Sequence, residues 1–184
     1  PIIELNGAGA GAGADGLRIT GNNSTIRDLI INRFDDDGIE ISGSNNTIIG
    51  SYIGLGVDGA TDLGNTGSGI EITGGATLNI IGGTGSGNGN VISGNTADGI
   101  TITGGSSGTT MLGNSIGTDS GGTLDRGNAG AGVAIINAGS NYVGGTSGGG
   151  NLIFGNDTNG VLIGGGGADG NEIVANTISS NTGH

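Results

Sequence analysis

The sequence repeats one short pattern, in which an Asn/Asp/Gly turn is followed by aliphatic residues two positions apart. The pattern is clearest in residues 90–105, where Ile100 and Ile102 flank Thr101 and follow an Asp-Gly pair. Alternation with a period of two is typical of a β-strand that buries one face. Asp-Gly pairs favour tight turns, because Gly adopts positive φ without steric cost. The pattern therefore predicts short strands joined by turns.

Three such strands recur in each of six repeats. The first strand follows a glycine and carries the inward pairs Leu17/Ile19, Ile39/Ile41, Ile70/Ile72, Ile100/Ile102, Val133/Ile135 and Val161/Ile163. The second strand contributes Ile26, Ile48, Ile80, Met111, Val143 and Ile173, and the third contributes Ile31, Ile53, Ile92, Ile116, Ile153 and Ile178. A period of about 20 to 35 residues with three short strands and Gly/Asn corners is typical of a parallel β-helix. We therefore predict an all-β fold, a single-stranded parallel β-helix of about six coils with three strands per coil.

The whole chain, residues 1–184, is predicted to form this one domain. Residues 1–15 are expected to hold part of a preceding coil, with a strand at Ile2 to Leu5, followed by a Gly/Ala loop from Gly7 to Ala14. Insertions alternate between two corners of the coils, a pattern that stacked coils absorb and that a β-sandwich of even hairpins does not. Exposed strand edges at the ends invite pairing, so end-to-end self-association is expected.

Composition and charge exclude several classes of partner. The 48 glycines and single proline approach low-complexity composition, yet the regular isoleucine spacing indicates an ordered fold. A net charge of −12, with only four basic residues, disfavours nucleic acid and anionic lipid surfaces. The absence of cysteine excludes disulfides, thiol catalysis and cysteine-ligated zinc. No apolar run is long enough to predict a membrane span.

Asparagines recur two residues before the inward isoleucine of the third strand. They are Asn90, Asn114, Asn151 and Asn176. An Asn side chain offers both a donor and an acceptor, and stacked Asn residues hydrogen-bond along the stacking axis of cross-β assemblies. We expect these four residues to form a structural ladder and not a ligand site.

Two groups of motifs in the sequence resemble those of a known family. Ile116-Gly-Thr-Asp with Gly132-Val, and Ile81-Gly-Gly-Thr with the segment from Asn90 to Asn95, resemble repeats in large secreted or surface proteins of bacteria. These are similar to the right-handed parallel β-helices of the pectate-lyase-like superfamily. The sequence differs from this motif at Leu55-Gly56, which occupy the positions that Thr118-Asp119 hold in the later repeat. It implies a right-handed helix and an extracellular or cell-surface location.

Two functions stay open. One is a structural or adhesive module of a secreted or cell-surface protein, with polysaccharide or cell-surface partners and no evident catalytic site. The alternative is a polysaccharide-binding or polysaccharide-degrading β-helix, lyase-like or glycosidase-like, with its active residues at the Asp35 to Asp37 edge. Whether the chain is an enzyme is left open. The absence of lysine, the single histidine (His184) and the scattered aromatic residues predict no cleavage of pectin, polygalacturonate or alginate.

One acidic set could hold a cation. Glu40 and Glu71 are the outward residues of consecutive first strands, so they should stack about 4.8 Å apart, and Asp35, Asp36 and Asp37 lie at the same edge. Clustered carboxylate oxygens are the ligands that Ca²⁺ prefers. A bound Ca²⁺ and a solvated acidic face eased by a nearby arginine are both compatible with the sequence, and no other cofactor is expected. Asp15, Asp37 and Asp98 each precede the glycine of a first strand and are expected to be turn residues.

Overall fold

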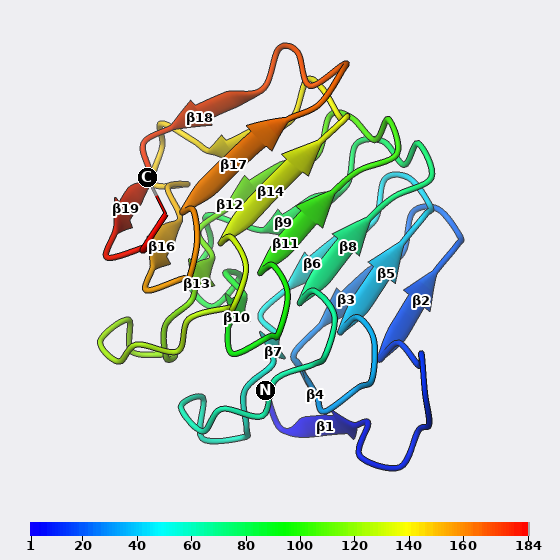
Figure 1. Ribbon diagram of the computed structural model, residues 1–184, viewed down its shortest axis with the longest axis vertical. Helices are drawn as coiled ribbons and strands as arrows, with labels where there is room; N and C mark the ends of the chain where they lie inside the picture. Colours follow the sequence, from blue (N-terminus) through cyan, green and yellow to red (C-terminus); the bar gives the residue numbers. More distant parts are fainter. Residues whose placement is uncertain (184) are drawn as a thin grey trace.

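The computed structural model describes residues 1–183, and it shows a right-handed parallel β-helix. The chain passes through three strands in each coil, and strands from successive coils pair in parallel to form three sheets (Figure 1). The predicted fold class is therefore confirmed. No helix within residues 1–183 could cross a membrane.

Each sheet is named here by its first strand. The β1 sheet holds β1 (Ile3–Asn6), β4 (Leu29–Asn32), β7 (Tyr52–Ile53), β10 (Val91–Ile92), β13 (Ser115–Ile116), β16 (Leu152–Phe154) and β19 (Thr177–Ser179). The β2 sheet holds β2 (Leu17–Ile19), β5 (Ile39–Ile41), β8 (Ile70–Ile72), β11 (Ile100–Ile102), β14 (Val133–Ile136) and β17 (Val161–Gly164). The β3 sheet holds β3 (Thr25–Arg27), β6 (Thr47–Ile49), β9 (Ile80–Gly82), β12 (Thr110–Leu112), β15 (Tyr142–Gly144) and β18 (Glu172–Val174).

The core is a column of aliphatic side chains between the three sheets. Residues at the same place in successive coils align, as Ile39 aligns with Ile70 and Ile70 with Ile100. All three of these isoleucines are fully buried. Because a strand alternates its two faces, this alignment keeps one face of every interior strand in the core.

One predicted inward residue is wrong. Ile80 was assigned to the core from the sequence, but it is 41% exposed, and Ile81 is the fully buried residue. Ile81 aligns with Ile48 and with Met111. Because Ile80 and Ile81 are adjacent, hydrophobicity alone does not show which of them points into the core. The neighbouring Asn79 fixes the register, because it lies two residues before Ile81 as Asn46 does before Ile48.

The four predicted ladder asparagines lie in one row beside the β1 sheet. The Nδ2 of Asn90 donates to the Oδ1 of Asn114 at 3.0 Å, and the next two steps, to Asn151 and then Asn176, are 2.9 Å each. Each Oδ1 also accepts the backbone N–H of the preceding row member, at 2.9–3.0 Å. One amide oxygen therefore joins two donors from the coil before it.

A second row, which the sequence reasoning missed, lies before the β2 sheet. Its members are Asn65, Asn95, Asn128, Asn156 and Asn181, and the Nδ2-to-Oδ1 distances along it are 2.8–2.9 Å. The signal was an asparagine four residues before the glycine that precedes each of β8, β11, β14 and β17. In the coil of β5 the position belongs to Phe34, whose backbone N–H donates to Asn65 Oδ1 at 3.1 Å.

A third row lies before the β3 sheet and is interrupted. Asn46, Asn79, Asn141 and Asn171 occupy it, with Thr109 between Asn79 and Asn141. Thr109 is fully buried, and among the described residues its Oγ1 finds no hydrogen-bond partner. Asn79 Nδ2 donates to the Gly43 carbonyl at 3.0 Å, as Asn46 Nδ2 does to the Gly21 carbonyl, and Thr109 offers it no side-chain bond. Threonine is thus the weak step of this row.

The end coils expose residues that the interior coils bury. Ile163, Ile173 and Ile178 are 38%, 43% and 44% exposed, whereas their interior equivalents are buried. At the other end, β1 pairs in parallel with β4 as the third strand of a preceding coil would. The expected end-to-end self-association stays a prediction, for which light scattering at high protein concentration is the direct measurement.

Replacing Thr109 by Asn is expected to stabilise the fold. The new Oδ1 would accept from Asn79 and the new Nδ2 could donate to Asn141, and the coils on either side already accommodate Asn at this position. A net gain of about 1 kcal/mol is typical of one added hydrogen bond, which corresponds to roughly 2–4 °C in the melting temperature of a domain this size. Thr110→Asn, on the outward neighbour, is the control and should give no gain. A Thr109→Asn variant that melts at or below the wild-type temperature would contradict the role given to these rows.

Candidate functional site

The outer face of the β2 sheet carries a row of charged side chains. Arg18 on β2, Glu40 on β5 and Glu71 on β8 align strand to strand, and Thr101 on β11 continues the row. The predicted stacking of Glu40 over Glu71 is therefore present in the register. Arg18 Nη1 lies 3.1 Å from Glu40 Oε2, so one of the two glutamates has a cationic partner.

A second acidic row runs along the turn before the same sheet. Asp15, Asp37 and Asp98 precede β2, β5 and β11. Each side chain accepts a backbone N–H from the following coil: Asp15 from Asp37 at 3.3 Å, Asp37 from Ser68 at 2.6 Å, and Asp98 from Ala131 at 2.6 Å. Besides shaping turns, these aspartates therefore join one coil to the next.

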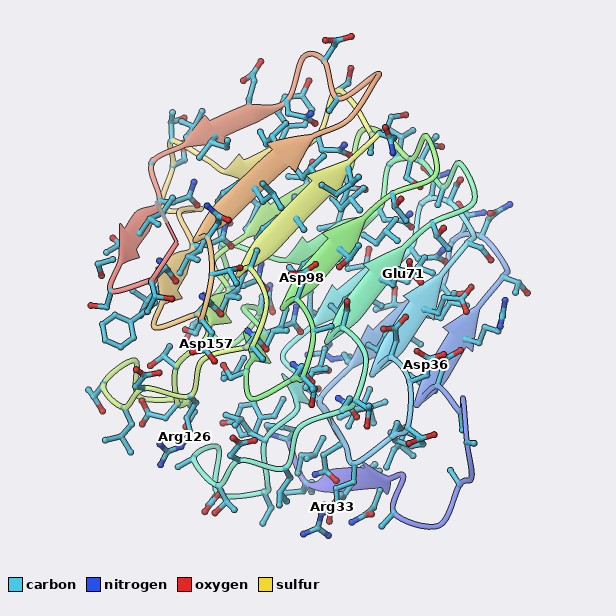
Figure 2. The ribbon with its side chains drawn as sticks, in the orientation of Figure 1. Arg33, Asp36, Glu71, Asp98, Arg126 and Asp157 are labelled. Atoms are coloured by element: carbon cyan, nitrogen blue, oxygen red, sulfur yellow. The ribbon has the colours of Figure 1, made fainter. Side chains whose placement is uncertain are left out.

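Together these residues form an acidic surface, defined here as Asp15, Asp36, Asp37, Glu40, Glu71 and Asp98. Figure 2 shows Asp36, Glu71 and Asp98 along one side of the molecule, over the strands of the β2 sheet. Carboxylate oxygens of Asp15, Asp36 and Asp37 lie within 4.8 Å of one another. The chemistry of this surface is that of hydrogen-bond acceptors and negative charge.

The predicted cation ligands are only partly brought together. Asp36 and Asp37 meet Asp15, which the sequence reasoning treated only as a turn residue, and the stacking of Asp15 on Asp37 explains its place in the cluster. Asp35 accepts the Gly13 N–H at 3.1 Å, and Glu40 pairs with Arg18. Ca²⁺ binding here stays a prediction, which requires a melting temperature that responds to Ca²⁺ and to EDTA.

Burial changes the acidity of two residues on this surface. Desolvation is the largest cause that raises the pKa of Asp37, which reaches about 7; the Ser68 N–H opposes the rise, and the charges of Glu71 and Asp36 add to it. Desolvation is also the first cause of a raised pKa at Glu40, where Arg18 acts in the opposite direction and Asp15 in the same one. Near neutral pH the buried Asp37 carboxyl can therefore hold a proton and donate a hydrogen bond to the neighbouring Glu71.

The remaining residues considered from the sequence lie elsewhere. Arg27 pairs with its neighbour Asp28 at 2.8 Å, away from the acidic surface, and Arg126 donates to the Ala60 carbonyl at 2.5 Å. His184 lies outside the described residues. Of the four arginines, Arg18 is the one that contacts the acidic surface.

These features define a parallel β-helix with an acidic outer face on one sheet. Among solved structures, the chain is similar to the crystal structure of a periplasmic alginate epimerase, AlgG, at a TM-score of 0.57 and 17% sequence identity, over 86% of this chain and 31% of that one. It also matches the A-module of the mannuronan C-5 epimerase AlgE4 of Azotobacter vinelandii, at a TM-score of 0.42 and 14% identity, over 88% of this chain and 54% of that one.

The likeness to AlgG supports the fold. This chain spans about a third of the length of AlgG and about half of the AlgE4 module. No protein-family description matches the sequence, and no curated protein matches it significantly.

The raised pKa of Asp37 gives the fold a pH dependence. Its folded pKa lies above the unfolded value, so the folded state binds more protons between about pH 4 and 7, and stability should fall as pH rises through that window. Asp37→Asn keeps an oxygen for the Ser68 N–H and removes the charge beside Glu71. We expect this variant to melt several degrees above the wild type at about pH 8, with a flatter pH profile.

Asp98→Asn is the matched control for this prediction. Asp98 bonds the next coil in the same way, but the residue that its side chain contacts is Thr101 and not a glutamate. Because it removes no charge beside a glutamate, this control should give no gain in melting temperature at about pH 8. Parallel profiles for wild type and Asp37→Asn would show that Asp37 does not titrate in this range.

Proposed function

We propose that this chain is a polysaccharide-binding β-helix segment, whose acidic surface holds a polymer bearing amino groups. The observation that carries the proposal is the register of the β2 sheet, which places the outward acids Glu40 and Glu71 on neighbouring strands, beside the aspartates of the preceding turns. Carboxylates accept hydrogen bonds from sugar hydroxyls and pair with ammonium groups. A linear polymer can contact several coils at once, because the surface extends along the stacking direction.

Charge selects among polysaccharides. With a net charge of −12, and Arg18 as the arginine on the acidic surface, a polyuronate meets repulsion along its length. An amino sugar polymer meets attraction instead. The proposed ligand thus differs from alginate, the polysaccharide named for AlgG. The shared fold supports a polysaccharide as the class of ligand.

A structural or adhesive role is compatible with this proposal. The asparagine rows hold successive coils in a fixed register, and a rigid surface binds an extended polymer with little loss of entropy. We propose an extracellular or cell-surface location, where such polymers are found. The periplasmic location named for AlgG is in keeping with this.

Calorimetric titration with a glucosamine hexamer and with a mannuronate hexamer tests the proposal. We expect the glucosamine hexamer to bind at about pH 6 and low ionic strength, where attraction between charges is least screened, and the mannuronate hexamer not to bind. Glu71→Gln with Asp36→Asn should weaken binding about tenfold or more. Glu172→Gln removes one exposed charge on β18, in the β3 sheet, and should have little effect. Equal losses in both variants, or preference for mannuronate, would contradict the proposal.

A second candidate function is hydrolysis of the same polymer. Asp37, with a pKa near 7 beside Glu71 and Asp36, provides a protonated acid next to carboxylates, and glycosidases use such a pair as acid and base. New reducing ends in the glucosamine hexamer mixture, abolished by Asp37→Asn, would support it. The expected lack of cleavage of pectin, polygalacturonate or alginate stays a prediction.

A further inference from the structure

A groove of about 500 Å³ lies on a different side of the helix, over the outer face of the β1 sheet. Its floor includes Tyr52 on β7, Val91 on β10 and Ser115 on β13, which align across three neighbouring strands. Its size is within the range of small-ligand sites in proteins. It is separate from the acidic surface, which is built on the β2 sheet.

The walls of the groove come from the insertions that alternate between two corners of the coils. On one side, residues 55–63 and 118–126 touch, because the Ser120 N–H donates to the Gly59 carbonyl at 2.8 Å. On the other side, residues 83–89 lie beside the sheet, where the Gly50 N–H donates to the Asn88 carbonyl at 3.1 Å. The groove therefore lies where both kinds of insertion flank the same strands.

The groove wall next to Tyr52 is formed by the tightly packed loops of Gly59 and Ser120. A Cβ placed on Gly59 would come within 3.0 Å of Tyr52 Cε2 and 2.4 Å of Ser120 Oγ, so this glycine lets the loop approach the ring. The loop of Ser120 is closed by Asp119, whose Oδ1 accepts the N–H groups of Thr123 and Leu124 at 2.7 Å each. The ring edge of Tyr52 is thus set by a loop with its own internal bonds.

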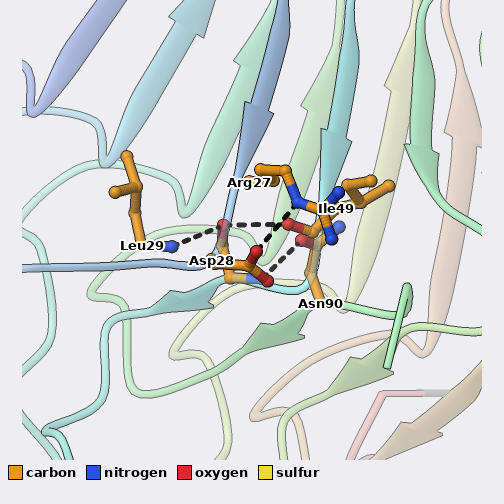
Figure 3. A network of polar contacts seen from close by, with 6 residues as sticks. Arg27, Asp28, Leu29, Ile49 and Asn90 are labelled. Atoms are coloured by element: carbon orange, nitrogen blue, oxygen red, sulfur yellow. Dashed lines mark hydrogen bonds and ion pairs between the residues drawn. The ribbon is translucent and has the colours of Figure 1, made fainter. Parts of the chain in front are cut away.

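One end of the groove carries a positioned carboxylate. Asp28 adopts a φ of 60°, its N–H donates to the Ile49 carbonyl at 3.2 Å, and Arg27 Nε donates to its Oδ2 at 2.8 Å (Figure 3). The other oxygen, Oδ1, lies over Gly50, where a Cβ would be 2.8 Å away. The Asp28 side chain is 55% exposed, so it can meet a ligand in the groove.

We infer that this groove binds a neutral oligosaccharide. An aromatic ring that can pack on the apolar face of a sugar, a carboxylate, and the hydroxyls of Ser115 and Ser120 are the groups that bind sugar rings. Glycines supply much of the remaining lining and leave backbone groups accessible. None of the described residues lining the groove is an arginine, and the Arg27 guanidinium beside it is already paired with Asp28, so the groove favours a neutral ligand over an anion.

Tyrosine emission gives a direct test of this site. The chain holds two tyrosines and no tryptophan, so emission reports on Tyr52 and Tyr142 alone. The probes are the β-1,4-linked hexamers of glucose, mannose and xylose. We expect at least one to bind and to change the emission, Tyr52→Ala to abolish both effects, and Tyr52→Phe to retain affinity within about threefold. Tyr142→Ala, on β15 in the β3 sheet, is the matched control and should retain both.

Ser115→Leu tests the groove without removing the tyrosine. Ser115 aligns with Leu152 of the next coil, so the fold already holds a leucine at the equivalent position. This variant should keep its melting temperature and lose at least tenfold in affinity, because the larger side chain fills the floor. Glu71→Gln should leave binding of the neutral hexamers unchanged, which separates this site from the proposed function. Absence of binding by all three hexamers, or binding that both Tyr52→Ala and Ser115→Leu leave intact, would overturn the inference.

Discussion

The structure depends on one interaction, in which a buried Asn amide oxygen accepts two hydrogen bonds from the preceding coil. Asn114 Oδ1, for example, accepts from both the backbone N–H and the Nδ2 of Asn90 at 3.0 Å. Strands such as β7 and β10 are only two residues long and offer few ladder bonds of their own. Rows at the corners add bonds just before the strands begin, so the coil spacing is kept through the turns. Buried amides that are fully paired in this way favour a single register.

Because the register is set by buried residues, the outward positions are free to carry function. The core and the corners set the register, and the outward residues then repeat along the stacking direction whatever their charge. Glu40 and Glu71 consequently stack despite their like charges, with Arg18 relieving one of them. Insertions are tolerated for the same reason, because residues 55–63 and 118–126 leave the helix and return to the same corner. The acidic surface and the groove both result from the fixed register of the stacked coils.

Much of the fold could be predicted from the sequence, because period-two isoleucines and Asn/Gly turns are local signals. The slip between Ile80 and Ile81 shows the limit of hydrophobicity alone, since both residues satisfy it and only the preceding asparagine distinguishes them. The acidic row followed from register, and the same register stacks Asp15 on Asp37, although from the sequence Asp15 was interpreted only as a turn residue. The groove was beyond sequence reasoning, since its walls come from insertions far apart in the chain.

Paired substitutions at Asn128 test the central claim most directly. Asn128 is fully buried, accepts from Asn95, and donates to Asn156 Oδ1 and to the Ile92 carbonyl. Asn128→Ala removes both functions, whereas Asn128→Asp keeps the shape and the acceptor and loses the donor. If the paired amide holds the coils, urea unfolding at about pH 8 should show each variant less stable than wild type by about 2 kcal/mol or more, with the aspartate no better than the alanine. An aspartate variant as stable as the wild type would contradict the account, because shape alone would then suffice.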